Sequence, residues 1–183
     1  MKKFNLLSFL LLFTVALVLP SCSDDDDDDG SSSSSFVFDG NTIEVENGFI
    51  ANIGPNGEIN GTETFDFDVF LTDENISAGG TFGITGTGDF ITLDLNTNSS
   101  MGLVAGTYNF SSSREAFSIV DGVVRTEFNT TTNSGTLSGI TLSANAGSVE
   151  VDINGSEVTL TVDLDLSDGS TLTGSYQGEL EGI

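Results

Sequence analysis

Apolar and polar residues alternate along most of the chain beyond residue 35, which is the pattern of a β-strand with one buried face. In residues 157–166, five aliphatic side chains fall on one face of such a strand and polar side chains fall on the other. The same alternation occurs in residues 149–153 and 65–71. A strand of this kind covers a core with one face and meets water with the other. The alternation therefore predicts antiparallel strands and not the doubly covered strands of a parallel sheet.

Asx-Gly pairs separate the alternating segments at the spacing of hairpins. Such pairs favour two-residue hairpin loops, because both positions of a type I′ turn need a positive φ. The pairs are Asp39-Gly40, Asn47-Gly48, Asn56-Gly57, Asn60-Gly61, Asp121-Gly122, Asn154-Gly155 and Asp168-Gly169. The strongest case is the pair at 121–122, which lies between two largely apolar segments, residues 117–120 and 123–128. We expect a hairpin turn there.

The pattern predicts thirteen candidate strands. We expect some of them to merge and others not to form, so that about ten strands result. The candidates are residues 36–38, 42–46, 49–53, 63–71, 81–85, 89–95, 106–111, 115–120, 123–129, 136–143, 147–153, 157–166 and 170–177. No segment has the periodicity of a long helix. Residues 72–80 and 96–103 could form one or two helical turns at most. Residues 36–183 suit one domain. They predict an all-β antiparallel sandwich of about ten strands, with a meandering β-barrel as the alternative.

The first 21 residues have the organisation of a cleaved signal peptide. Lys2 and Lys3 precede a largely apolar stretch, residues 4–19. As a helix this stretch would be about 24 Å long, which is short of the ~20 residues that a membrane-spanning helix needs. A signal segment that is removed from the mature protein is the better interpretation.

The sequence Leu19-Pro20-Ser21-Cys22 follows the apolar stretch and resembles the lipobox of bacterial lipoproteins. In that family the Cys sulfur receives a diacylglycerol and the new N-terminus is usually acylated, for example with palmitate. The resemblance implies lipid attachment at Cys22 and a membrane partner. Two or three acyl chains anchor a protein stably, whereas one gives marginal binding. The alternative is an ordinary secreted protein with one free thiol.

Residues 22–35 predict a disordered tether. Cys22 and Ser23 are followed by Asp24, Asp25, Asp26, Asp27, Asp28 and Asp29, then by Gly30 and a run of Ser. None of these side chains can bury apolar surface, and adjacent carboxylates repel one another. An acidic run directly behind an acylated Cys resembles the surface-export signal of Bacteroidota-type lipoproteins. The resemblance implies an outer-membrane protein that faces the cell exterior, and a plain solvated spacer is the alternative.

Composition excludes several classes of function. The chain has 28 acidic and four basic residues, one Cys and no His, with a formal net charge of −24. Without His, the usual zinc and copper sites and the Ser-His-Asp and Cys-His nucleophiles are excluded. The acidic excess repels phosphate backbones, so we expect no nucleic-acid partner. Residues 36–183 alone carry 22 acidic side chains and two basic ones, Arg114 and Arg125.

Carboxylates are the abundant reactive groups, so a glycoside hydrolase has to be considered. Asp66 with Asp68, and Asp163 with Asp165, are i, i+2 neighbours on one strand face. Their spacing fits the separation of about 5–9.5 Å that such enzymes need. Strand alternation produces the same spacing without any catalytic role, so we expect a protein that is not an enzyme and assign no catalytic residue.

Oxygen ligands also suit Ca²⁺, the only cofactor that this composition favours. Two loops are weak candidates: residues 152–157, with the sequence Asp-Ile-Asn-Gly-Ser-Glu, and residues 73–75. Neither contains the full twelve-residue EF-hand pattern. Metal ligands therefore stay unassigned, and a calcium-dependent adhesion module remains one alternative function.

Few residues suggest how a ligand would be held. Many glycan-binding modules stack sugars on exposed aromatic rings, but the domain has no Trp, and its Tyr residues are Tyr108 and Tyr176. Phe70 falls on the face of the neighbouring aspartates, where it either contacts a ligand or packs under a loop. Arg125 and Glu127 share a strand face and predict an exposed ion pair worth less than about 1 kcal/mol.

The strand rhythm of residues 147–180 resembles small uncharacterised all-β domains of the same class of lipoproteins, with no catalytic motif to transfer. We therefore expect a non-enzymatic, lipid-anchored envelope protein. Its β-domain would have a binding or structural role toward an extracellular glycan or another envelope protein. The alternative from a different class is a surface glycan hydrolase that uses paired carboxylates. The sequence does not define the oligomeric state.

Overall fold

The computed structural model of the protein describes residues 34–80, 83–132, 134–136 and 146–183. All described residues belong to one unit of contacting residues. The predicted signal segment, Cys22 and the acidic run at 24–29 lie outside the described residues, so they stay predictions.

The described part of the chain is built from strands and contains no helix, which confirms the all-β class. The strands in chain order are β1 (Ser34–Phe38), β2 (Asn41–Val45), β3 (Asn47–Ile59), β4 (Thr62–Thr72), β5 (Ile76–Ala78), β6 (Ile84–Thr97), β7 (Gly106–Phe110), β8 (Ser118–Asn129), β9 (Ser134–Thr136), β10 (Ala146–Asn154), β11 (Glu157–Asp165) and β12 (Thr171–Gly182). No helix in this part of the chain is long and apolar enough to cross a membrane.

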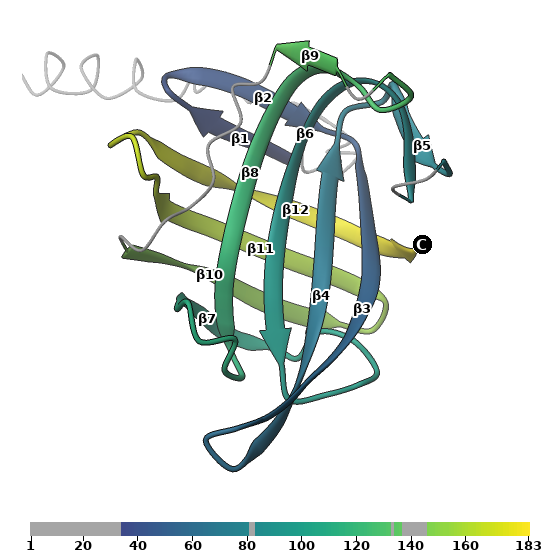
Figure 1. Cartoon of the computed structure of the whole chain (residues 1–183). Helices are drawn as coiled ribbons and strands as arrows, with labels where there is room; N and C mark the ends of the chain where they lie inside the picture. Colours follow the sequence, from purple (N-terminus) through teal and green to yellow (C-terminus); the bar gives the residue numbers. More distant parts are fainter. Residues whose placement is uncertain (1–33, 81–82, 133, 137–145) are drawn as a thin grey trace, which may run out of the picture. The chain divides into compact units, whose positions relative to one another are not determined.

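The strands form a sheet folded into two layers, which fits the predicted sandwich (Figure 1). The first layer has the strand order β8-β6-β4-β3, and the second contains β10, β11 and β12 with β1, β2 and β7. In Figure 1 the first layer lies in front, and its strands cross those behind. Short parallel pairings, β3 with β12 and β7 with β8, connect the layers, whereas the other described pairings are antiparallel.

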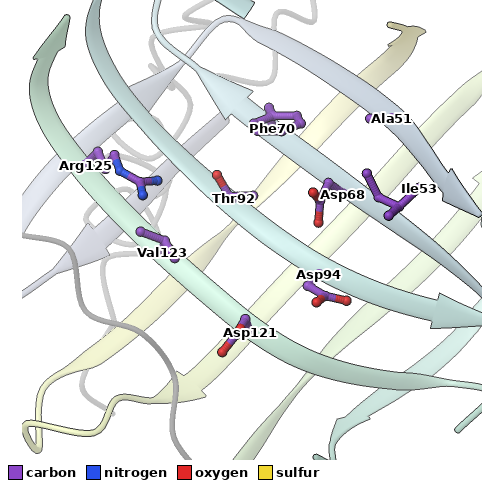
Figure 2. A pocket seen from close by; sticks show the side chains of 9 residues that line it. All are labelled: Ala51, Ile53, Asp68, Phe70, Thr92, Asp94, Asp121, Val123 and Arg125. Atoms are coloured by element: carbon purple, nitrogen blue, oxygen red, sulfur yellow. The ribbon is translucent and has the colours of Figure 1, made fainter. Parts of the chain in front are cut away.

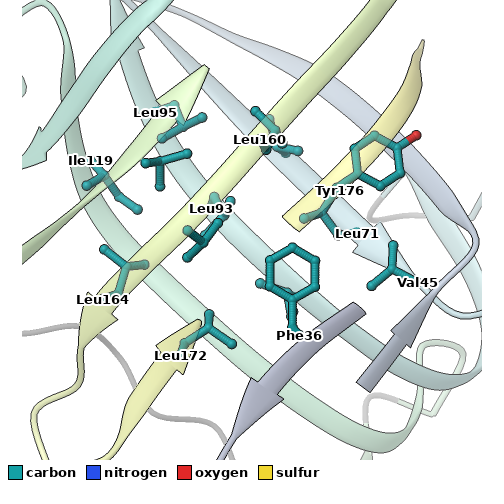
Figure 3. Close-up of a cluster of buried hydrophobic side chains, with 14 of the residues drawn as sticks. Phe36, Val45, Leu71, Leu93, Leu95, Ile119, Leu160, Leu164, Leu172 and Tyr176 are labelled. Carbon is teal, nitrogen blue, oxygen red and sulfur yellow. The ribbon is translucent and has the colours of Figure 1, made fainter. Parts of the chain in front are cut away.

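The main core lies between the two layers and is filled by the apolar positions of the alternating strands (Figure 3). Leu93 and Leu95 of β6 share this core with Leu160 and Leu164 of β11, and all four are 0% exposed. Complete burial of such a side chain contributes about 1.5–3 kcal/mol. Because strand residues alternate, the intervening side chains of the first layer point to its opposite face, here called the outer face.

A smaller apolar cluster lies on the outer face at one end of the first layer. It consists of Phe49, Ile76, Ile84, Phe90 and Phe128, with Phe70 packed against it. β5 pairs with β6 and supplies Ile76, so this short hairpin covers the cluster. The cluster explains why Phe70 lies on the face of Asp66 and Asp68, as its position in the sequence predicts.

Two of the predicted Asx-Gly turns adopt the expected backbone geometry. Asp39 and Gly40 have φ values of 48° and 75° and connect β1 to β2. Asn60 and Gly61 have φ values of 53° and 80° and connect β3 to β4. Both residues of each pair are left-handed, as a type I′ turn requires.

The predicted hairpin at Asp121-Gly122 is wrong. These residues lie inside β8, where Asp121 pairs with Asp94 and Gly122 pairs with Leu93 of β6. The long neighbouring strand offers backbone partners on both sides of the pair, and this pairing overrides the local turn preference. The predicted strands 115–120 and 123–129 are therefore largely one strand.

Other strand boundaries differ by smaller amounts. β1 begins at Ser34, inside the predicted tether, because Ser34 pairs with Val45 and its Oγ accepts a hydrogen bond from the Gln177 N–H at 3.0 Å. β6 begins at Ile84, so it joins the end of the predicted strand 81–85 to the predicted strand 89–95, while residues 81–82 lie outside the described residues. Most of the predicted strand 136–143 lies outside the described residues.

Candidate functional site

Three aspartates from neighbouring strands lie side by side on the outer face. Asp68 of β4 pairs with Asp94 of β6, and Asp94 pairs with Asp121 of β8. These three side chains form the carboxylate row. Directly opposite residues in antiparallel strands have Cα atoms about 4.5–5.5 Å apart, and like charges in such positions destabilise a sheet. An arrangement that opposes folding in this way points to a functional role.

Asp66 and Arg114 extend the site beside the row. One carboxylate oxygen each from Asp66, Asp68 and Asp94 lie within 4.8 Å of one another. Arg114, from the loop between β7 and β8, forms ion pairs with Asp66 and with Asp94, the latter at 2.8 Å between Nη2 and Oδ2. Its φ of 50° is a left-handed conformation that non-glycine residues seldom adopt. Among the described residues, no base forms an ion pair with Asp68 or Asp121.

Asp66 also has an unused acceptor. The residue is only 8% exposed, and its Oδ2 accepts a hydrogen bond from Arg114. Its Oδ1 is buried and has no hydrogen-bond partner within the described part of the chain. A buried carboxylate oxygen without a partner costs free energy. It is therefore available to a proton donor or a cation supplied by a ligand.

The surroundings raise the pKa values of three carboxyl groups in this site. Burial and the negative charge of Asp94 raise the pKa of Asp66 to about 7, although Arg114 acts in the opposite direction. Burial and Asp94 likewise raise the pKa of Asp68 to about 6. The pKa of Asp121 is raised for the same two reasons. The carboxylates are therefore crowded and short of positive charge, and a cation would relieve both effects.

Side-chain amides connect the carboxylates to the β3–β4 hairpin. Asn96 is 0% exposed and donates a hydrogen bond from Nδ2 to Oδ1 of Asp94 at 3.3 Å. Its own Oδ1 accepts a bond from Nδ2 of Asn56 at 2.6 Å. The Asn60 side chain also donates to Glu115, next to Arg114, at 3.3 Å. The hairpin thus helps to hold both the row and the loop that carries Arg114.

A pocket of about 490 Å³ opens over the row on the outer face (Figure 2). Apolar, polar and charged side chains from four neighbouring strands contribute to its lining. These residues are Ala51, Ile53, Asp68, Phe70, Thr92, Asp94, Asp121, Val123 and Arg125. The volume is within the range of about 300–1,000 Å³ that is typical of sites for small ligands.

Arg125 lies at the other end of this outer pocket from Asp121. The two residues are four positions apart along β8, which corresponds to about 13 Å between their Cα atoms. The guanidinium packs over the rings of Phe90 and Phe128, at 5.4 and 5.3 Å from the ring centroids. Burial lowers the pKa of Arg125. Its Nε is buried without a hydrogen-bond partner among the described residues.

The predicted ion pair between Arg125 and Glu127 does not form. The only ion pairs within the described residues belong to Arg114. Glu127 has a φ of 50°, and the pairing of β8 with both neighbours shifts register around it. The strand alternation that predicts a shared face is therefore interrupted between the two residues.

The other sequence candidates do not form comparable clusters. Asp163 and Asp165 are exposed on β11, in the second layer. In residues 152–157, Asn154 pairs with Glu157 and the segment is a hairpin between β10 and β11. Among the described residues, the only group of three carboxylates with the spacing of a metal site is the one that contains Asp66, Asp68 and Asp94.

Two further candidates have structural roles. The carboxylate of Asp73 accepts hydrogen bonds from the backbone N–H groups of Asn75 and Asp89, at 2.9 and 2.8 Å, and so fixes a loop. Tyr108 and Tyr176 are 0% and 4% exposed, so neither offers a ring to a sugar.

The oxygen donors of Asp66, Asp68 and Asp94 have the chemistry that Ca²⁺ and Mg²⁺ prefer. However, the guanidinium of Arg114 already neutralises part of the charge of two of them. A divalent ion would have to share these carboxylates with Arg114 or displace it.

Sequence reasoning identified Asp66 and Asp68 as a pair but missed Asp94, Asp121 and the role of Arg114. Asp121 was assigned to a turn, and Asp94 looked like any polar residue of an alternating strand. Their significance depends on which strands are neighbours and in which register, and no local signal carries that information.

Comparison of the chain with protein-family models, with curated proteins and with solved structures found no match. Its function is therefore inferred from the chemistry of the site.

Proposed function

We propose that this protein is a non-enzymatic, lipid-anchored binding protein of the cell envelope. Cys22 carries the lipid, and the acidic run at residues 24–29 directs the domain to the outer surface of the outer membrane. The β-domain binds a small ligand in the outer pocket, with a cationic group of the ligand on the carboxylate row.

The observation that carries the binding role is the row itself. Asp68, Asp94 and Asp121 are consecutive cross-strand neighbours, and the nearest base, Arg114, forms an ion pair with only one of them. All three side chains of the row line the outer pocket. The unpartnered oxygen of the buried Asp66 beside the row supports the same conclusion independently. A cation bound here would offset repulsion that the fold leaves uncompensated.

Calorimetric titration of residues 22–183 with spermidine tests this proposal. Spermidine is a flexible cation that any acidic protein attracts, so the comparison between matched variants decides the result. Asp121→Asn removes one charge from the row, and Asp163→Asn removes one charge from an exposed site on β11. We expect Asp121→Asn to weaken binding by about tenfold, the effect of losing a charged hydrogen bond.

The control Asp163→Asn should change the affinity by less than about twofold, as expected for an exposed charge. Equal effects of the two variants would show that spermidine responds to net charge alone, and the proposed site would then be wrong.

A second candidate function, glycan hydrolysis by paired carboxylates, is favoured by one observation. Asp66 and Asp68 are neighbours whose pKa values are raised to about 7 and about 6, so one of the pair can hold a proton near neutral pH. Release of reducing ends from soluble polysaccharides tests it. An activity that Asp66→Asn and Asp68→Asn abolish, and that Asp163→Asn leaves intact, would replace the binding role with catalysis.

A further inference from the structure

Arg125 is an unusual base for so acidic a domain. Residues 36–183 contain 22 acidic side chains and two basic ones, yet none of the described acids forms an ion pair with Arg125. Its guanidinium instead lies against Phe90 and Phe128 and faces the outer pocket. Aromatic packing fixes the group in place without neutralising it, so the positive charge remains available to a ligand.

The two kinds of charge are at opposite ends of one pocket (Figure 2). Asp94 and Asp121 are register partners in one row, and Phe90 and Arg125 are partners in a second row four residues away along both strands. At about 3.3 Å per residue these rows are about 13 Å apart.

The lining between the two ends is apolar with one polar group. Val123 lies between Asp121 and Arg125 on β8, and Thr92 occupies the middle position on β6. The Oγ1 atom of Thr92 is buried without a hydrogen-bond partner within the described residues. A ligand that suits the pocket therefore carries a cation at one end, an anion at the other, and a short stem with hydrogen-bonding groups between them.

From this charge pattern we infer that the outer pocket binds a short peptide with free ends. The N-terminal ammonium group lies on the carboxylate row, and the C-terminal carboxylate pairs with Arg125. At about 3.3–3.6 Å per extended residue, three residues span about 10 Å, which is comparable to the separation of about 13 Å between the two rows. The inference rests on the proposed function and specifies the ligand of the same site.

Calorimetric titration of residues 22–183 with trialanine tests the inference directly. Three further compounds separate its parts. Two are blocked peptides: trialanine amide lacks the carboxylate, and N-acetyl trialanine lacks the ammonium group. The third, free alanine, is too short to reach both ends. We expect trialanine to bind and each blocked peptide to bind about tenfold more weakly. Free alanine should bind more weakly still, because it can satisfy only one end at a time.

Variants assign each end of the peptide to its side chain. Arg125→Gln should reduce the affinity for trialanine by about tenfold, as amidation does. In this variant, amidation of the peptide should not reduce the affinity further. In Asp121→Asn, acetylation of the peptide should reduce the affinity much less than it does in the unaltered protein. Amidation should reduce the affinity as much as before. Arg125→Lys, which retains the charge, should recover part of the affinity, and Asp163→Asn should leave the affinity unchanged.

Equal binding of trialanine and its amide would overturn the inference, and so would additive losses from amidation and Arg125→Gln. If Arg125→Gln fails to fold, the comparison of the peptides on the unaltered protein still decides the matter. The spermidine titration distinguishes failure of the peptide inference from failure of the proposed cation site. Row-dependent binding of spermidine without binding of trialanine leaves the cation site standing and removes only the peptide, whereas loss of both removes the site.

Discussion

Asp66 and Asp68 couple the stability of the domain to pH. Their folded-state pKa values, about 7 and about 6, lie above the ordinary value of 3.8. Between these values the folded protein keeps protons that the unfolded chain has lost, so protonation favours the folded state. Stability from this source is present at low pH and is lost as the pH rises through the folded-state values.

We therefore expect the free energy of unfolding to fall by about 1–3 kcal/mol between about pH 4.5 and pH 7.5. Urea unfolding at a series of pH values measures this change. Asp66→Asn, whose amide resembles the protonated acid, should reduce the slope, whereas Asp163→Asn should leave most of it. An unchanged slope in Asp66→Asn would contradict the pKa assignment.

Arg114 acts as a built-in counter-ion for the site. Its guanidinium pairs with Asp66 and Asp94, whose side chains are 11% and 12% exposed, while its own side chain is 36% exposed. Removing a partner from largely buried carboxylates leaves charge without compensation. We expect Arg114→Gln to destabilise the domain by about 1–2 kcal/mol at neutral pH, the lower range for such a partly exposed pair. Chemical denaturation measures the loss, and no change would show that the ion pairs are incidental.

The same residue should control the response to calcium. While Arg114 occupies the carboxylates of Asp66 and Asp94, millimolar Ca²⁺ should leave the melting temperature nearly unchanged. In Arg114→Gln the vacated oxygen ligands suit Ca²⁺, and binding to the folded state raises its stability. We expect the melting temperature of this variant to rise with Ca²⁺ and to return with EDTA. A larger rise in the unaltered protein than in the variant would contradict this role.

At the residue scale, the sequence was sufficient to select Asp66 and Asp68 but not to separate them from Asp163 and Asp165. Both pairs have identical spacing on alternating strands. What differs is burial and the approach of Asp94 and Arg114, and these depend on strands distant in sequence. The Arg125 prediction failed for the converse reason, because register shifts around Glu127 interrupt the alternation on which it relied.

At the element scale, β12 connects the layers and depends on a glycine at one point. Gly174 pairs with Phe36 of β1 on one side and with Val162 of β11 on the other. Its φ is 154°, and a Cβ atom there would lie 2.3 Å from the backbone oxygen of Ser35. A backbone atom in a paired strand cannot move aside cheaply.

We expect Gly174→Ala to destabilise the domain by about 2–4 kcal/mol through the clash and the backbone strain. Gly155→Ala is the matched control. Gly155 also has a positive φ, 69°, but nothing lies within 4 Å of its added Cβ, so only about 1 kcal/mol of conformational cost applies. Thermal unfolding compares the two, and equal losses would show that the strand junction tolerates the extra atom.

Prediction of elements succeeded where local chemistry and long-range pairing agree. Asn60-Gly61 is a turn because the strands on either side pair with each other. Asp121-Gly122 has the same turn chemistry, but β6 pairs with the residues on both sides of it and keeps β8 extended. This error also concealed the site, since it removed Asp121 from the strand face that carries the row.

At the scale of the whole molecule, the anchor and the domain have separate chemistry. Cys22, the proposed site of lipid attachment, is the sole Cys of the chain, so the β-domain itself contains no thiol. The charged groups that the domain offers to the proposed ligand are carboxylates and the guanidinium of Arg125. In the proposed function, lipidation would determine where the ligand is bound, and the outer pocket would determine which ligand it is.

We expect Cys22→Ala to abolish labelling with a palmitate analogue and to release the protein from the membrane fraction.

Protease added to intact cells should degrade the unaltered protein if the acidic run exports it, and replacing residues 24–29 by Ser should protect it. Degradation of both forms to the same extent would show that the acidic run is only a spacer.

The proposed function requires that the carboxylate row on the outer face binds the ligand's cationic group. Backbone amide shifts in a ¹H–¹⁵N NMR titration of residues 22–183 with spermidine locate the bound cation most directly. We predict that the largest shifts belong to Asp68, Asp94 and Asp121 and to their neighbours on β4, β6 and β8. Shifts spread evenly over the exposed acids of β10, β11 and β12, or confined to the acidic run, would contradict the claim.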